Sequence, residues 1–79
     1  MTTRDRLATV FEKAFGFDPQ RFSLQLAPED VPNWDSIGHM NLVASLEEEF
    51  KQQFEVDEIM EMSSPQKILD ILKAKGVPD

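Results

Sequence analysis

Ser36 and His39 are the first two residues of this 79-residue chain to suggest chemistry, because a hydroxyl beside an imidazole can form a nucleophile and its base. His39 is the only histidine, and on a helix it would lie about one turn from Ser36. A hydrolytic site also needs a group that orients the base and a pocket that excludes water. A chain this short has little room for both. We therefore expect no enzymatic activity, and we expect His39 to be an exposed helix residue, placed to contact a partner or a bound phosphate.

Asp35 and Ser36 stand directly before apolar residues at helical spacing, so either side chain can cap the first turn of a helix. A hydroxyl at a helix start would also present an esterified phosphate to free backbone amides and to the positive end of the helix dipole. Most serines at helix starts are ordinary caps. The residues alone therefore leave two interpretations of Ser36 open, a cap or an attachment point for a phosphodiester.

The composition excludes several functional classes. The chain has no cysteine, so it forms no disulfide, offers no thiolate ligand and has no thiol of its own. The acidic residues 55–61 do not follow the calcium-loop pattern, and we expect no metal site. No stretch approaches the ~18 apolar residues of a membrane span, and the start of the chain does not resemble a signal peptide. We expect a cytoplasmic monomer.

Acidic charge is concentrated in the middle of the chain. The net charge is −7, which argues against nucleic-acid binding because phosphate contacts need clustered Lys and Arg. Residues 27–62 hold ten acidic residues and one basic residue, whereas the remaining 43 residues hold five acidic and seven basic. This surface would attract a basic protein partner, or it is a well-solvated face that keeps the domain soluble.

Apolar periodicity predicts three main helices and one short helix. The first covers about residues 3–15, with Thr2 and Asp5 as a capping box and Gly16 as its stop. The second covers 35–50, and the residues of its apolar face are Ile37, Met40, Val43, Ala44, Leu46 and Phe50. The run Glu47 to Glu49 lies at the unfavourable end of the helix dipole, so propensity does not explain it.

The short helix is expected at about 57–61, with Val56, Ile59, Met60 and Met62 supplying one face. Ser64 and Pro65 open the last helix, although Ser63 with Gln66 offers a competing cap, and Gly76 and Pro78 close it. Its buried face consists of Ile68, Leu69, Ile71 and Leu72.

The segment 17–34 shows no period and contains three prolines, so it is a long connection with at most a short turn of helix. Its apolar residues should hold it against the bundle: Phe17, Phe22, Leu24, Leu26, Val31 and Trp34. We expect Trp34 to be a buried anchor. The predicted fold is a small all-α four-helix bundle that forms one domain over residues 1–79.

These residues carry a family resemblance. Asp35-Ser36-Ile37, followed by Leu42-Val43, by 46–50 (Leu-Glu-Glu-Glu-Phe) and by Val56 and Ile59, closely resembles the acyl carrier proteins, whose motif is Asp-Ser-Leu at the start of the second helix. The resemblance covers nearly the whole chain, including its length, its acidity, the long first loop and the last helix opened by Ser-Pro-Gln. It implies the acyl-carrier bundle.

The resemblance also implies a function. Ser36 would receive 4′-phosphopantetheine from coenzyme A, in a magnesium-dependent reaction of a separate phosphopantetheinyl transferase. The thiol of that arm would hold acyl groups as thioesters for acyltransferases, ketosynthases or similar enzymes of fatty acid, specialised lipid or polyketide synthesis. The carrier itself does not catalyse. The resemblance assigns partner recognition to Asp35, Ile37, Met40, Asn41, Glu47 and Glu48.

In carriers of this type an acyl chain can enter between the second and third helices. The corresponding residues here are core residues by default, and they are Met40, Val43, Leu46, Ile59, Met62 and Ile68. The chain departs from the family at Gly38 and Asn41, where typical fatty-acid carriers have acidic residues. We expect Gly38 to serve close approach of a partner or the arm, or to be a neutral change on an exposed face. The departures favour a specialised pathway over the housekeeping carrier.

Two alternatives stay open. One is an unmodified acidic helical module that binds a basic protein through the helix 35–50. The other is a peptidyl or aminoacyl carrier of non-ribosomal synthesis. Modification of Ser36 separates both kinds of carrier from the unmodified module.

Overall fold

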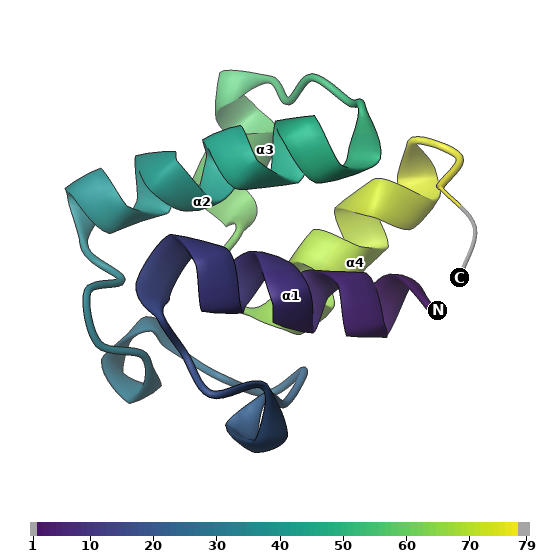
Figure 1. Cartoon of the computed structure of the whole chain (residues 1–79). Helices are drawn as coiled ribbons and strands as arrows, with labels where there is room; N and C mark the ends of the chain where they lie inside the picture. The colour runs from purple at the N-terminus through teal and green to yellow at the C-terminus, as the bar shows by residue number, and fades with distance from the viewer. Residues whose placement is uncertain (1, 78–79) are drawn as a thin grey trace.

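The computed structural model describes residues 2–77, and within that range the chain forms four α helices and two short 3-10 turns, without a β-strand. In order these are α1 (Thr3–Phe15), η1 (Pro19–Arg21), η2 (Pro28–Asp30), α2 (Ser36–Phe50), α3 (Val56–Glu61) and α4 (Pro65–Ala74). Helix α1 packs along α2, and α4 packs against α1 and α3 (Figure 1). The prediction of a small all-α bundle with three main helices and one short one is confirmed.

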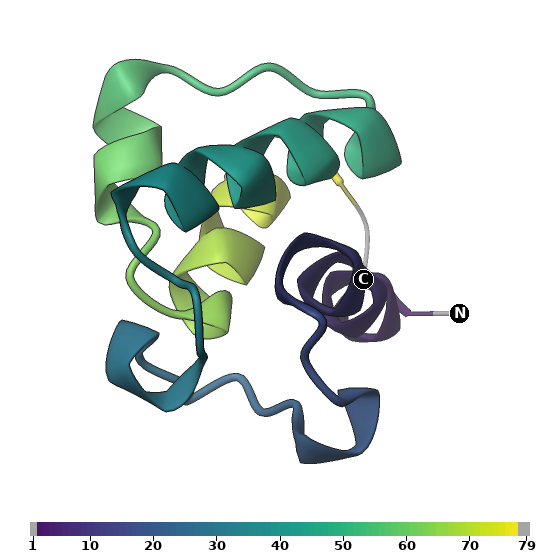
Figure 2. The same ribbon diagram turned by 60° about the vertical axis from the view of Figure 1, so that its left-hand side comes forward.

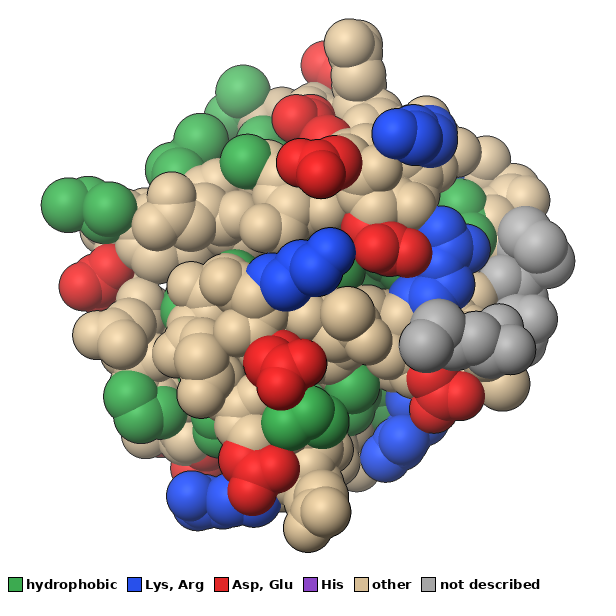
Figure 3. All heavy atoms as spheres, in the orientation of Figure 1, with side chains coloured by type: hydrophobic (Ala, Val, Ile, Leu, Met, Phe, Trp, Pro, Cys, Tyr) green, Lys and Arg blue, Asp and Glu red, His purple; other side chains and the backbone are tan. Residues whose placement is uncertain are grey.

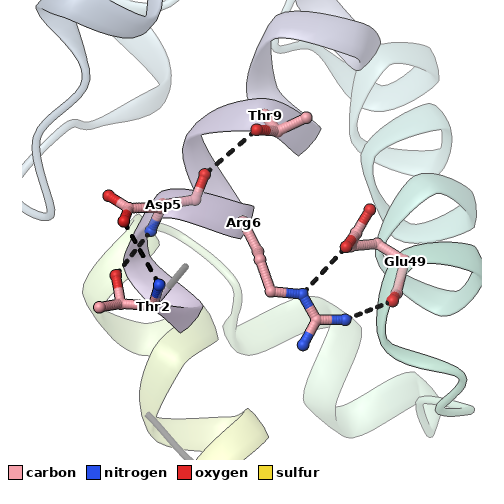
Figure 4. A network of polar contacts seen from close by, with 5 residues as sticks. All are labelled: Thr2, Asp5, Arg6, Thr9 and Glu49. Atoms are coloured by element: carbon pink, nitrogen blue, oxygen red, sulfur yellow. Dashed lines mark hydrogen bonds and ion pairs between the residues drawn. The ribbon is translucent and has the colours of Figure 1, made fainter.

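Local signals set the two ends of α1 as predicted. The Thr2 hydroxyl accepts a hydrogen bond from the backbone N–H of Asp5 at 3.1 Å, and the Asp5 carboxylate accepts one from the N–H of Thr2 at 3.3 Å (Figure 4). Gly16 ends the helix in the left-handed conformation, at φ 67°, which a glycine adopts without steric cost. Side chain and backbone together thus define where α1 begins and ends.

The last helix also begins where its sequence predicts. Ser64 is the cap, because its hydroxyl accepts from the backbone N–H of the residue three positions on, at 3.3 Å, and Pro65 is the first helical residue. The competing cap at Ser63 is not used. Gly76, at φ 92°, follows the helix as expected, whereas Pro78 lies outside the described residues. The short helix α3 begins one residue earlier than predicted.

The long connection between α1 and α2 runs beneath the helices in both views (Figures 1 and 2). Its apolar residues hold it there as predicted: Phe17, Phe22, Val31 and Trp34 are buried, and Leu24 and Leu26 are partly buried. The Leu24 carbonyl also accepts from the N–H of Gln66 at 3.0 Å, which ties the loop to the start of α4. The loop is therefore part of the packed structure.

Aromatic rings fill the core between α1 and this loop. The ring of Phe11 is fully buried and meets Phe15, Phe22 and Trp34 edge to face, at centroid distances of 5.6, 5.3 and 5.3 Å. Such pairs add about 0.5–1.5 kcal/mol each to the gain from burial. They fix the loop residue Trp34, and with it the start of α2.

Candidate functional site

The geometry at the start of α2 shows which of the two residues, Asp35 or Ser36, caps the helix. Asp35 is the cap: its side-chain oxygen accepts from the N–H of Gly38 at 2.8 Å. Ser36 is the first helical residue, and its side chain is exposed. Because Asp35 fills the capping role, the interpretation of Ser36 as the ordinary cap of this helix is wrong.

An open groove of about 490 Å³ begins at Ser36. It lies between the start of α2, the turn η2 and the end of α3, and its lining residues are Pro28, Trp34, Asp35, Ser36, His39, Met60, Met62 and Ser63. Four of these side chains are apolar. A volume in this range is typical of sites for small organic ligands.

His39 is half buried beside this groove, so the prediction of an exposed residue is wrong. Its ring lies edge to edge with that of Trp34 and nearly in the same plane, with the centroids 6.2 Å apart and the planes 13° from parallel. Trp34 Nε1 donates to His39 Nδ1 at 2.9 Å, and His39 Nε2 lies 2.8 Å from the carbonyl oxygen of Ile59 in α3. An indole N–H can only donate, so Nδ1 accepts and the neutral ring carries its proton on Nε2.

Gly38 is buried, so the prediction that it lies on an exposed face is wrong. Its burial also leaves no room for a partner to approach it closely. A Cβ built on Gly38 would lie 1.8 Å from the carbonyl oxygen of Asn33. The close approach is made by the loop of the chain itself, in which Asn33 has the left-handed φ of 72°. Glycine at position 38 lets the carbonyl of Asn33 lie against the first turn of α2, and Trp34 is the next residue of the loop.

Two of the three glutamates at the end of α2 have intramolecular partners. The Glu47 carboxylate accepts from the N–H of Phe54 at 3.2 Å. Glu49 is bound by Arg6 of α1, with Nε 2.9 Å from its carboxylate and the guanidinium 2.7 Å from its backbone oxygen (Figure 4). The third, Glu48, is exposed and free to meet a partner. These contacts explain two carboxylates at an end of the helix that disfavours them.

The predicted apolar face of α2 is partly wrong. Val43, Leu46 and Phe50 are buried, but Ile37 and Met40 are 77% and 56% exposed, and Ala44 is exposed as well. Leu42 and Gly38 complete the buried face instead. The residues toward the core are thus displaced around the helix from the face that the apolar spacing predicted.

The exposed apolar residues extend from α2 onto α3. Val56 and Met60, predicted to lie on the buried face of the short helix, are 68% and 79% exposed. We call Ile37, Met40, Val56 and Met60 the apolar strip. Figure 3 shows hydrophobic side chains gathered at the upper left of the molecule, over the first half of α2 and over α3. Asp35 and Asn41 are exposed on the same helix as Ile37.

Most of the predicted acyl-chain residues meet in the core. Val43, Leu46, Met62 and Ile68 are at most 4% exposed, and Ile59 is partly buried against them. Met40 is the exception, since it lies on the surface and not in the core.

Trp34, Met60 and Ser63 line the groove although the sequence did not single them out as site residues. The sequence feature that could have revealed this site is Trp34. A buried indole N–H needs an acceptor, and His39, one turn into α2, provides it.

The remaining electrostatics concern α3. The N–H of Glu55 donates to the Glu58 carboxylate at 2.8 Å, and the Lys75 ammonium lies 3.1 Å from it. These two contacts, the backbone hydrogen bond first, lower the pKa of Glu58 below its ordinary value. The described part of the chain brings no three His, Asp or Glu side chains together in a metal-binding cluster.

Among residues 2–77 no helix is both long and apolar enough to cross a bilayer. Comparisons of the chain with family models, with curated proteins and with solved structures give no match.

Proposed function

We propose that this protein is a carrier that holds acyl groups on a 4′-phosphopantetheine arm attached to Ser36. One observation carries the proposal: Ser36 is exposed at the first position of α2, Asp35 does the capping in its place, and a groove with apolar walls opens beside it. A hydroxyl with no capping role at this position is suited to modification. The groove is suited to the flexible arm that follows.

The start of α2 fits the phosphate of such an arm. The backbone N–H groups of Ser36 and Ile37 belong to the first turn, where intrahelical acceptors are lacking, and the helix dipole is positive there. Esterification would join Ser36 Oγ to the phosphorus next to the pantetheine. The bond from that phosphorus to the nucleotide half of coenzyme A would break, and the serine proton would pass to a base of the transferase.

The groove fits the rest of the arm. Trp34, Met60 and Met62 offer apolar walls, and His39 and Ser63 add polar groups between them. When bound, the arm supplies a thiol that carries an acyl group as a thioester. The chain has no cysteine, so this chemistry has to be brought in by a cofactor.

Partner enzymes would bind along the exposed face of α2. The apolar strip offers contact area, and the exposed carboxylates of Asp35 and Glu48 suit basic patches on a transferase, an acyltransferase or a ketosynthase. Asn41 is available on this surface too, whereas Glu47 is partly buried and engaged by Phe54. We therefore expect Glu47 to contribute less to recognition than Glu48.

Intact-protein mass tests this proposal. The purified chain is incubated with coenzyme A, Mg²⁺ and a broad-specificity phosphopantetheinyl transferase. We expect the wild type to gain the mass of one phosphopantetheine and Ser36→Ala to gain nothing. Ser63→Ala is the matched control, because Ser63 is an exposed serine on the same groove, and this variant should be modified like the wild type. An unmodified wild type with a helical circular dichroism spectrum would contradict the proposal and favour an unmodified module that binds through the apolar strip.

A further inference from the structure

Helix α3 has few contacts of its own to hold it. It has six residues, and none of them is fully buried. A helix this short is not stable in isolation, because nucleation costs more than so few hydrogen bonds return. Its position therefore depends on the contacts that join it to the rest of the bundle.

Three kinds of contact hold α3. The first is burial: Phe54 and Met62, on either side of the helix, are 8% and 1% exposed, and Ile59 within it is partly buried against the core. Glu58 pairs with Lys75 beyond the end of α4 at 3.1 Å. The third contact is the hydrogen bond from His39 Nε2 to the Ile59 carbonyl, 2.8 Å long, which joins α3 directly to α2.

The His39 ring is held in the orientation that this last bond needs. Trp34 is 7% exposed, lies nearly in the plane of the His39 ring and donates to its Nδ1 at 2.9 Å. Donation to Nδ1 leaves the proton on Nε2, where it points to α3. Because the loop residue fixes the ring, little side-chain entropy remains to be lost when the bond to Ile59 forms.

We propose that His39 is a positioning residue that latches α3 onto α2 and thereby sets the width of the groove beside Ser36. The far wall of this groove is formed by Met60 and Met62, at the end of α3. With the latch closed, the groove has the shape described above. With it open, α3 moves away and the groove widens. The meaning of this motion for an attached arm rests on the proposed function, but the latch itself does not.

Two substitutions of His39 test its two hydrogen bonds separately. In His39→Asn the amide oxygen takes the place of Nδ1 and keeps an acceptor for Trp34, but no donor reaches Ile59. In His39→Gln the amide nitrogen takes the place of Nε2 and keeps that donor. Both replace a neutral ring by a neutral amide, so they are matched in charge.

Amide hydrogen exchange of the unmodified protein tests the latch. The reporters are the N–H groups of Ile59 and Met62, which donate to the carbonyls of Glu55 and Ile59. Loss of one hydrogen bond should raise local opening about 3- to 10-fold in His39→Asn, while α1 and α4 exchange as in the wild type. His39→Gln keeps the donor to Ile59 but loses the acceptor for Trp34, so its exchange should rise less than that of His39→Asn. Unchanged exchange in His39→Asn, equal acceleration in both variants, or equal acceleration of all helices would overturn the latch.

The effect on the arm has its own measurement. The chain has no cysteine, so in protein loaded with phosphopantetheine a small alkylating reagent such as iodoacetamide reacts with the arm thiol alone. We expect His39→Asn to raise the alkylation rate by the same factor as α3 opening, and His39→Gln to raise it less. Equal rates in all three proteins would refute control of the arm by the latch. If Ser36 is not modified in any of them, the proposed function fails. Hydrogen exchange still shows whether His39 holds α3 on α2.

Discussion

Gly38→Ala is a substitution for which helix propensity and the tertiary structure of this protein predict opposite results. In a helix interior Ala is more favourable than Gly by about 1 kcal/mol, so propensity alone predicts a more stable protein. In the folded chain, however, the added Cβ would lie 1.8 Å from the carbonyl oxygen of Asn33 and 3.0 Å from Cε1 of Phe15. The first contact cannot exist, so α2 and the loop must separate.

The magnitude follows from what has to move. Overpacking a filled site costs about 1–3 kcal/mol. The upper end applies here, because the obstacle is backbone and the next residue, Trp34, is locked into the aromatic core. After the propensity gain is subtracted, we expect a net loss of about 2 kcal/mol, which lowers the Tm of a domain of this size by roughly 8–16 °C.

Thermal unfolding followed by circular dichroism measures this loss, with urea unfolding as a second assay. Asn41→Ala is the control, because Asn41 is exposed on the same helix and alanine there should raise stability by a few tenths of a kcal/mol. The emission of Trp34 should change in Gly38→Ala and not in the control, since its loop is displaced. A Tm that rises in both variants would refute the close approach of the loop to α2.

Met62→Ala should destabilise the protein by about 2–5 kcal/mol, because Met62 is 1% exposed, whereas Met60→Ala, at 79% exposure, should change the unfolding free energy by less than about 0.5 kcal/mol. Urea unfolding measures both, and similar losses would contradict the orientation of α3. Lys75→Met should raise the pKa of Glu58 only part of the way to its ordinary value, since the N–H of Glu55 still donates. Because folding lowers this pKa, the stabilisation by Glu58 is present above the unfolded value of about 4.3 and is lost as the pH falls through the folded value. Carboxylate NMR titration checks the shift, and an unchanged pKa would exclude a contribution from Lys75.

Helix boundaries could be predicted from the sequence because their causes are local. The capping box of Thr2 and Asp5, the left-handed stop at Gly16 and the Ser64-Pro65 start each act within a few residues. The same holds for Asp35 and Ser36 as the start of α2, although only the backbone geometry assigns the cap to Asp35. Apolar periodicity likewise predicted most of the buried face of α4, where Ile68, Leu69 and Leu72 are buried.

The side chains around Ser36 could not be placed in this way, because the connection 17–34 has no periodicity from which its path follows. The approach of Asn33 and of Phe15 to the first turn of α2 buries Gly38, which the local sequence pattern predicted to be exposed. The same path of the loop brings Trp34 to His39. His39, which the spacing predicted to be exposed, is therefore half buried and joins Trp34 to Ile59.

The sequence by itself thus determined the helices, their ends and the serine at the start of α2, since each depends on neighbours a few residues away. Only the tertiary structure decided which face of α2 is buried, that Met40 is exposed, and that a groove opens beside Ser36. A helix period identifies residues that share a face, but a chain with more apolar residues than one face needs does not specify which of them meet the core. Helix α1, which packs along α2, and the loop residue Asn33, which meets Gly38, made that choice.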